Sequence, residues 1–225
     1  ICEGDRCLHL PPAGAFRWDP RAGSGRDPFA LARRVGQMRG ELELQLAERW
    51  AWKDKPLRVE IRLRKGVKFP DKPGVMKSRE LVAQDVVDSF ERLNASPRKN
   101  PGYFDHVEKV EASDRYTVVF TMNAYSADWD FRFGWGFFSG IVPREVVEKG
   151  ASDWRNANGS GPFVLADYLH GSAVTYSRNP IYWDSERIAG QDFKLPFVDR
   201  IVYRTIRDES TFLTALRTGK LDVLE

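Results

Sequence analysis

Side chains that often catalyse reactions are present in this sequence, but their spacing matches no catalytic or metal-binding pattern. The histidines His9, His106 and His170 are far apart, and none has a second ligand at the short spacing used by zinc sites. Ser160 lies between two glycines, yet no base is marked for it. The acidic pairs are Glu108 with Glu111 and Asp128 with Asp130. Since nothing brings these pairs to a cleft, we predict no catalytic residue, no metal and no cofactor.

A different chemistry, ligand binding by aromatic stacking, is indicated between residues 129 and 138. The aromatic residues there are Trp129, Phe131, Phe133, Trp135, Phe137 and Phe138. In a strand, alternate side chains point to opposite faces, so one face cannot bury them all. We expect some to face a cleft, where Gly134, Gly136 and Gly140 allow close approach to the backbone. The alternative is that they fill the core. Tyr103, after a Pro-Gly turn, is a second candidate.

The elements that would position these residues begin with strands. Residues 57–63 alternate apolar and charged side chains, which predicts a half-buried antiparallel strand. Residues 107–112 and 115–122 predict a hairpin, and residues 29–50 have a partly helical spacing. A helix is predicted after Ser78, which we expect to be its N-cap.

The last third of the chain alternates strands and helices. Pro143 is expected as the first residue of a helix that stops at Gly150. The turn at residues 158–162 is expected to use glycines with positive φ, and residues 163–168 and 173–177 to pair. A strand over residues 198–206 precedes a helix capped by Asp208. We therefore predict an α/β architecture with some parallel pairing, in two units that meet near residue 140.

Composition narrows the functional class. Hydrophobic residues make up 42% and charged residues 30% of the chain, which indicates a folded protein. The net charge of +3 comes from interspersed charges, so no nucleic-acid partner is expected. No apolar run reaches the roughly 20 residues of a membrane-spanning helix. Cys2 and Cys7 fit either a small disulfide loop or two free thiols.

Several phrases, in a fixed order, resemble the family-5 extracellular solute-binding proteins. They are LAERW (46–50), LRKGVKF (63–69), DVVDSFERL (85–93), IVP (141–143), GSGPF (159–163), SRNPIYW (177–183) and LRTGKLD (216–222). The chain departs from the family in the loop after residue 69, where residues 71–74 replace an acidic-glycine turn. It also departs at Val82, where the family has a capping threonine. The family includes the dipeptide, oligopeptide and nickel binders of ATP-driven importers.

The resemblance implies a type II periplasmic-binding-protein lobe, a mixed sheet with flanking helices, plus a smaller α+β accessory domain. Residues 1–22 and 140–225 are then expected in lobe I, which is incomplete here, and residues 23–139 in the accessory domain. The second lobe is expected to lie outside this chain. The stretch before the IVP phrase lies beside the ligand cleft in the family, so Trp135, Phe137, Phe138 and Ser139 are the expected lining, with Tyr103.

The resemblance also implies a non-enzymatic function. The expected role is the periplasmic or cell-surface solute-binding component of an ABC importer. Such a protein, expected to be a monomer, captures a peptide-like or other small solute in a cleft between its lobes and delivers it to the permease subunits. The alternatives are a hydrolase completed by the missing lobe, and a peptide chaperone or chemoreceptor adaptor. A hydrolase requires a nucleophile beside a base, whereas an adaptor requires a large apolar patch on its outer surface.

Overall fold

The structure is a computed structural model, and it describes residues 32–35, 41–44, 46–97, 99, 101–126, 129–134 and 140–223. The strands of the first half are β1 (Ala32–Val35), β2 (Glu41–Leu44), β3 (Ala47–Asp54), β4 (Leu57–Leu63), β5 (Lys68–Phe69), β6 (Arg79–Glu80), β7 (Val107–Asp114) and β8 (Thr117–Met122). Those of the second half are β9 (Phe163–Leu169), β10 (Ala173–Arg178), β11 (Ser185–Ile188), β12 (Gln191–Lys194) and β13 (Arg200–Arg204). The helices are α1 (Ala83–Asn94), α2 (Trp129–Gly134), α3 (Arg144–Gly150), α4 (Glu209–Arg217) and the 3-10 turn η1 (Trp154–Asn156).

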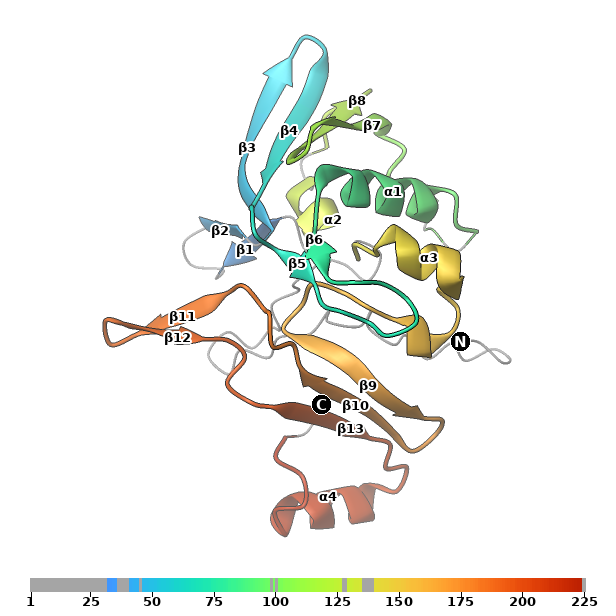
Figure 1. Cartoon of the computed structure of the whole chain (residues 1–225), viewed down its shortest axis with the longest axis vertical. Coiled ribbons are helices and arrows are strands. Elements are labelled where there is room, and N and C mark those ends of the chain that lie inside the picture. The colour runs from blue at the N-terminus through green and yellow to red at the C-terminus, as the bar shows by residue number, and fades with distance from the viewer. Residues whose placement is uncertain are drawn as a thin grey trace.

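A four-stranded antiparallel sheet in the order β3-β4-β8-β7 forms the upper part of the molecule (Figure 1). Its central strand β4 is the strand predicted from apolar alternation: Val59, Ile61 and Leu63 are buried, whereas the charged residues between them are only half-buried. The predicted hairpin is also confirmed, because β7 pairs with β8. The apolar face of this sheet is covered by α1, which packs against β7 and β8.

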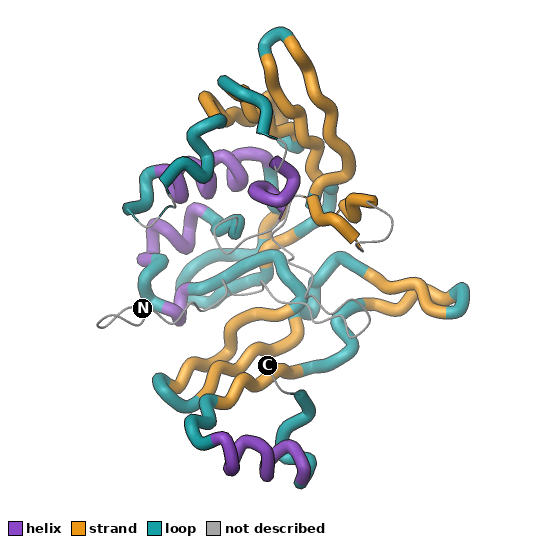
Figure 2. The backbone as a smooth tube through the Cα atoms, turned by 180° about the vertical axis from the view of Figure 1, so that it is seen from behind, coloured by secondary structure: helices purple, strands orange, loops and turns teal. Residues whose placement is uncertain are grey.

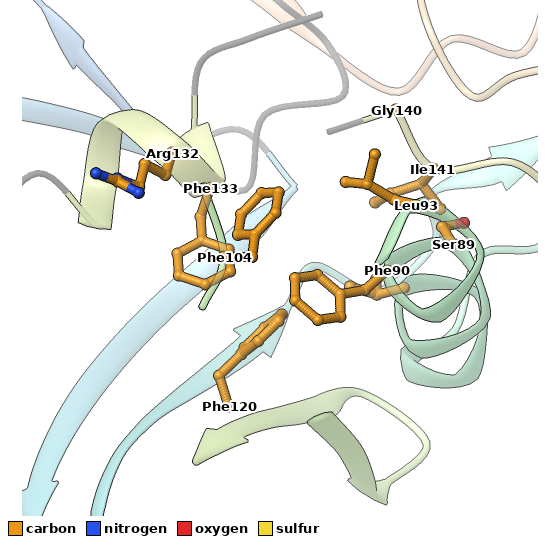
Figure 3. A pocket seen from close by; sticks show the side chains of 10 residues that line it. Ser89, Phe90, Leu93, Phe104, Phe120, Arg132, Phe133, Gly140 and Ile141 are labelled. Atoms are coloured by element: carbon orange, nitrogen blue, oxygen red, sulfur yellow. The ribbon is translucent and has the colours of Figure 1, made fainter. Parts of the chain in front are cut away.

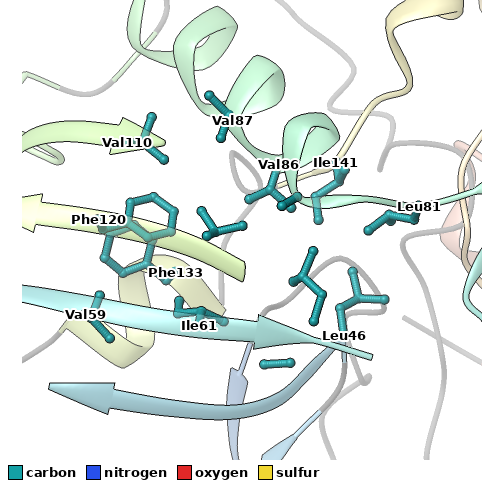
Figure 4. Close-up of a cluster of buried hydrophobic side chains, with 14 of the residues drawn as sticks. Leu46, Val59, Ile61, Leu81, Val86, Val87, Val110, Phe120, Phe133 and Ile141 are labelled. Atoms are coloured by element: carbon teal, nitrogen blue, oxygen red, sulfur yellow. The ribbon is translucent and has the colours of Figure 1, made fainter. Parts of the chain in front are cut away.

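The main core fills the space between this sheet and the helices (Figure 4). Val59 and Phe120 meet Val86 of α1 and Phe133 of α2 there. The same buried cluster includes residues 141 and 146, so it crosses the predicted boundary at residue 140. Burying apolar surface contributes about 25 cal/mol per Å², and this continuous cluster therefore ties the segment after residue 140 to the upper sheet.

A second, three-stranded antiparallel sheet in the order β13-β10-β9 lies below the first, with α4 beyond it (Figures 1 and 2). The predicted pairing of residues 163–168 with 173–177 is confirmed by β9 and β10. Phe163, Leu165 and Tyr176 form a separate small core. Every strand pair in the described segments is antiparallel, so the expected parallel pairing is not found there.

Two local expectations were wrong. The partly helical interpretation of residues 29–50 fails, because β1, β2 and the start of β3 occupy much of it. Ser78 does not cap α1, because its hydroxyl donates to the Phe69 carbonyl (2.9 Å). The N-cap is Val82, and the Asp85 carboxylate accepts its N–H (2.9 Å), which satisfies a donor that would otherwise be unpaired at the helix start.

The helix ends of the second half follow the predicted chemistry more closely. Pro143 is the N-cap of α3 rather than its first residue, one position from the prediction, and α3 ends at Gly150 (φ 113°). Asp208 caps α4 as predicted, accepting the N–H of Thr211 at 2.7 Å. Although α4 is amphipathic, none of its residues is buried.

Candidate functional site

Most of the predicted ligand-lining residues lie outside the part of the chain that the structure describes. These residues are Trp135, Phe137, Phe138 and Ser139. The cysteine pair and the predicted start of lobe I, residues 1–22, lie outside it as well. The site is therefore built from the neighbours of the predicted stretch: α2 before it, residues 140–146 after it, and Tyr103.

Two of the aromatic residues belong to the core. Residues 129–134 are helical, not extended, so Trp129 and Phe133 lie one turn apart on the same face. Both are buried, at 7% and 4% exposure. Trp129 packs edge-on against Trp52 (5.3 Å between ring centroids), and Phe133 lies 4.6 Å from Phe120. For these two residues the core alternative is correct.

Tyr103, the fifth predicted residue, is half-buried in the loop before β7. The Arg132 guanidinium lies over its ring, 5.1 Å from the centroid, and also donates to its carbonyl oxygen. The Tyr103 ring also meets the Phe104 ring edge-on, at 4.8 Å between centroids. The cation–π contact and the hydrogen bond from Arg132 hold the tyrosine loop against α2. The structure thus brings Tyr103 beside the helix that leads into the predicted stretch.

A small apolar cavity lies between α1, α2 and β8 (Figure 3). The rings of Phe90, Phe104, Phe120 and Phe133 surround it, and Ile141 closes one side. Its volume is about 30 Å³, which is room for about one water molecule. An apolar void of this size cannot hold a peptide or another solute. We therefore do not assign the ligand to it.

The segment after the predicted stretch is fixed to α1. The Ser89 hydroxyl accepts the N–H of Val142 (2.9 Å) and contacts its carbonyl oxygen (3.3 Å). Ile141 and Val146 are each 2% exposed. The backbone that follows residues 135–139 is therefore held by a side chain of α1 and by two buried anchors.

The glycine-rich turn is held by buried asparagines rather than by positive φ. Asn158 donates to the Pro70 carbonyl (2.9 Å), and Asn179 donates to the Gly161 carbonyl (2.8 Å). Gly159 and Gly161 do not appear among the described glycines with positive φ, so that expectation was wrong. The Ser160 hydroxyl is buried and has no hydrogen-bond partner in the described structure, which also leaves it without a base.

The remaining polar groups do not assemble into a catalytic constellation in the described segments. His170 is exposed and contacts the Tyr168 hydroxyl (3.2 Å). Glu111 pairs with Lys109 on the outer face of the upper sheet. No group of three or more His, Cys, Asp or Glu side chains in the described segments could hold a metal ion. Nor is any described helix long and apolar enough to cross a membrane.

The outer face of the upper sheet carries a wide hollow of about 670 Å³. Its floor includes Arg58, Glu60 and Thr121. Arg58 and Glu60 form an ion pair at 2.9 Å, in which both side chains are 32% exposed. Paired, half-exposed charges on a sheet face are typical of a solvated surface. We do not assign this hollow to the candidate site.

Residues 41–225 match the model of the bacterial extracellular solute-binding proteins, family 5, middle region. This match covers most of the chain. The chain belongs to family 5 of the extracellular solute-binding proteins. The resemblance seen in the sequence phrases is therefore confirmed, and so is the fold class, because solved type II periplasmic binding proteins share this architecture.

Individual relatives of this family-5 protein differ in ligand. Di/tripeptide-binding protein 2 of Pseudomonas aeruginosa is 28% identical, over 79% of this chain and 35% of its own length. Heme-binding protein A of Haemophilus influenzae is 29% identical, over 82% of this chain and 35% of its own length. Among solved structures, DppA of Helicobacter pylori, in complex with the peptide STSA, is similar with a TM-score of 0.70. That structure is 27% identical, and the match covers 93% of this chain and 43% of DppA.

The family-5 chain thus spans about a third of the length of the curated relatives it matches, since 35% of each is covered. The relatives named above are binding proteins and not enzymes. Sequence reasoning missed the contacts that fix the segment after residue 140, because they join residues far apart in the chain. No local pattern marks Ser89 as a partner of that segment.

Proposed function

We propose that this protein is the periplasmic solute-binding component of an ABC importer and that it captures a short peptide. The observation that carries this proposal is the family match over residues 41–225, together with relatives named as di/tripeptide-binding proteins. The protein would bind its ligand, close around it and deliver it to the permease subunits without a covalent step. It would act as a monomer without a cofactor.

The ligand would lie in a cleft lined by Trp135, Phe137, Phe138 and Ser139, with Tyr103 at its side. Aromatic side chains with a few polar anchors suit a peptide, because its apolar side chains stack while its backbone needs hydrogen bonds. The described neighbours support this assignment in one respect. Tyr103 contacts α2 through Arg132, and Val142 is bonded to Ser89 of α1.

We also keep the predicted division of the chain, with residues 1–22 and 140–225 in lobe I and residues 23–139 in the accessory domain. The main core continues across residue 140, so the two parts would move together as one body. The accessory domain would be a rigid extension of lobe I. Closure would then move the second lobe, supplied by the rest of the full-length protein, toward this combined body.

The test is calorimetric titration of the full-length protein with a defined mixture of dipeptides and tripeptides. Haem is titrated separately, because one relative is named for binding it. We expect the protein to bind peptides and not to bind haem. If it binds haem alone, its ligand is haem and not a peptide. If neither probe binds and mass spectrometry finds no co-purified small solute, the proposed function is wrong.

A variant pair tests the aromatic lining. We expect Trp135→Ala to weaken peptide binding by about tenfold or more, as for loss of an aromatic contact at the centre of an interface. Tyr125→Ala is the matched control, because Tyr125 is 62% exposed and its removal should leave affinity unchanged. Loss of the folded state in Trp135→Ala would assign Trp135 to the core instead.

A further inference from the structure

Arg79 of β6 bonds carboxylates from two different helices. Its Nη1 and Nη2 donate to Asp85 of α1 at 2.9 and 2.7 Å. Its Nε and Nη2 donate to Glu145 of α3 at 2.5 and 2.8 Å. Arg79 and Glu145 are 66 positions apart in the sequence. One guanidinium therefore joins the first turn of α1 to the first turn of α3.

The groups around the Arg79 guanidinium limit which other side chain could take its place. Asp85 is 3% exposed, and a carboxylate buried to this extent needs a cation or several hydrogen-bond donors. It already accepts the N–H of Val82, so Arg79 and the helix start share it. The buried ring of Phe69 lies 5.2 Å from the guanidinium carbon and limits where that group can move.

The position of Glu145 connects this cluster to the proposed ligand site. Glu145 is the second residue of α3, and α3 follows directly on residues 140–143. Ser89, four residues after Asp85 on α1, holds Val142. The segment that comes next after the proposed lining is thus fixed to α1 at two points, one ionic and one through a hydroxyl.

We propose that Arg79 is a positioning residue of the ligand site: it holds α3, and with it residues 140–146, in the place that the proposed lining requires. It would not contact ligand. Lysine would not replace it, because a single ammonium cannot make paired hydrogen bonds to two carboxylates in a fixed plane. The proposal rests on the proposed function and names a residue on which that function depends.

The experiment uses the full-length protein with Arg79→Gln, Arg79→Lys and Glu145→Gln, and with Arg92→Gln as the control. Arg92 is an exposed arginine on α1, the helix that carries Asp85. Affinity for the defined dipeptide and tripeptide mixture is measured by calorimetry at a temperature where every variant is folded. Hydrogen exchange of the amides in residues 142–150 is measured beside that of the β4 and β8 amides.

We expect Arg79→Gln and Arg79→Lys to weaken peptide binding by about two- to thirtyfold, the range for substitutions that act without touching ligand. Exchange should rise in residues 142–150 and stay unchanged in β4 and β8. Adding Arg79→Gln to Glu145→Gln should lower affinity little further, because both remove the same link. Arg92→Gln should match the wild type.

Two results would overturn the proposal while the wild type still binds peptide. One is unchanged exchange in residues 142–150, which would show that Arg79 does not hold α3. The other is faster exchange there with the affinity of the Arg92→Gln control, which would make Arg79 purely structural. If the wild type binds none of the peptides, the proposed function fails and the positioning role fails with it.

Discussion

Phe120 is a side chain of the upper sheet that contacts both α1 and α2, and its removal tests the main core. It is 1% exposed, and its ring lies 5.4 Å from Phe90 and 4.6 Å from Phe133. Truncating a buried phenylalanine to alanine costs about 3–5 kcal/mol. Because Phe120 is almost completely buried and packed between two other rings, we expect the upper part of that range.

The measurement is native-state hydrogen exchange of the β4 and β8 amides in the full-length protein, which reports the free energy of opening for this unit alone. Phe120→Ala should lower it by about 4–5 kcal/mol, and Phe120→Leu by clearly less, since leucine refills part of the space. Thr121→Ala is the control, because Thr121 lies on the outer face next to Phe120. A loss below about 2 kcal/mol for Phe120→Ala would refute the cooperative aromatic core described above.

Three further perturbations test separate parts of the structure. The hydrogen bond from Arg79 lowers the pKa of Glu145 in the folded protein. The Glu145 carboxylate therefore stabilises the fold fully above the ordinary glutamate pKa of about 4.3. This stabilisation is lost as the pH falls through the lowered folded-state pKa. The stability difference between wild type and Glu145→Gln should therefore shrink as the pH falls below about 5 in acid titrations monitored by circular dichroism; a pH-independent difference would contradict this. Asn158→Ala should cost about 1–3 kcal/mol in urea unfolding, because the buried Pro70 carbonyl loses its donor, and a neutral result would mean that the link does not stabilise the fold. Burial raises the pKa of the Tyr176 hydroxyl to about 12 and leaves it without a partner in the described structure, so Tyr176→Phe should leave the melting temperature unchanged or raise it; a clear decrease would reveal a bound water.

Local patterns predicted the elements whose signal is local. Residues 57–63 alternate so regularly that only a half-buried strand satisfies them, and Asp208 has the acceptor that a helix start needs. The same local reasoning failed at residues 29–50, where the spacing of a few apolar residues favoured a helix. The alternation of Trp50 and Trp52 with charged and small residues was the better signal, since both indoles lie on the core side of β3 and meet Trp129.

The candidate site was predictable only in part, for a physical reason. Aromatic residues carry the same composition signal whether they line a cleft or fill a core, and helical spacing decided the matter for Trp129 and Phe133. The ties of residues 140–146 to α1 depend on register between elements that are distant in sequence. Ser78 shows the same limit. No local pattern predicted the short β5–β6 pair, and the Ser78 hydroxyl bonds to Phe69 of β5 instead of capping the helix.

The buried pair Asn158-Gly159 has a consequence for the chemical lifetime of the protein. An asparagine followed by glycine is prone to deamidation, because the glycine nitrogen can attack the side-chain carbonyl carbon and form a cyclic imide. Here the asparagine is 5% exposed, its amide group donates to the Pro70 carbonyl, and its oxygen accepts the Gly159 N–H (3.1 Å). Ring closure would have to break these contacts. Deamidation of Asn158 should therefore occur mainly in molecules that have unfolded. The deamidated fraction of a sample would then indicate how many of its molecules have been unfolded.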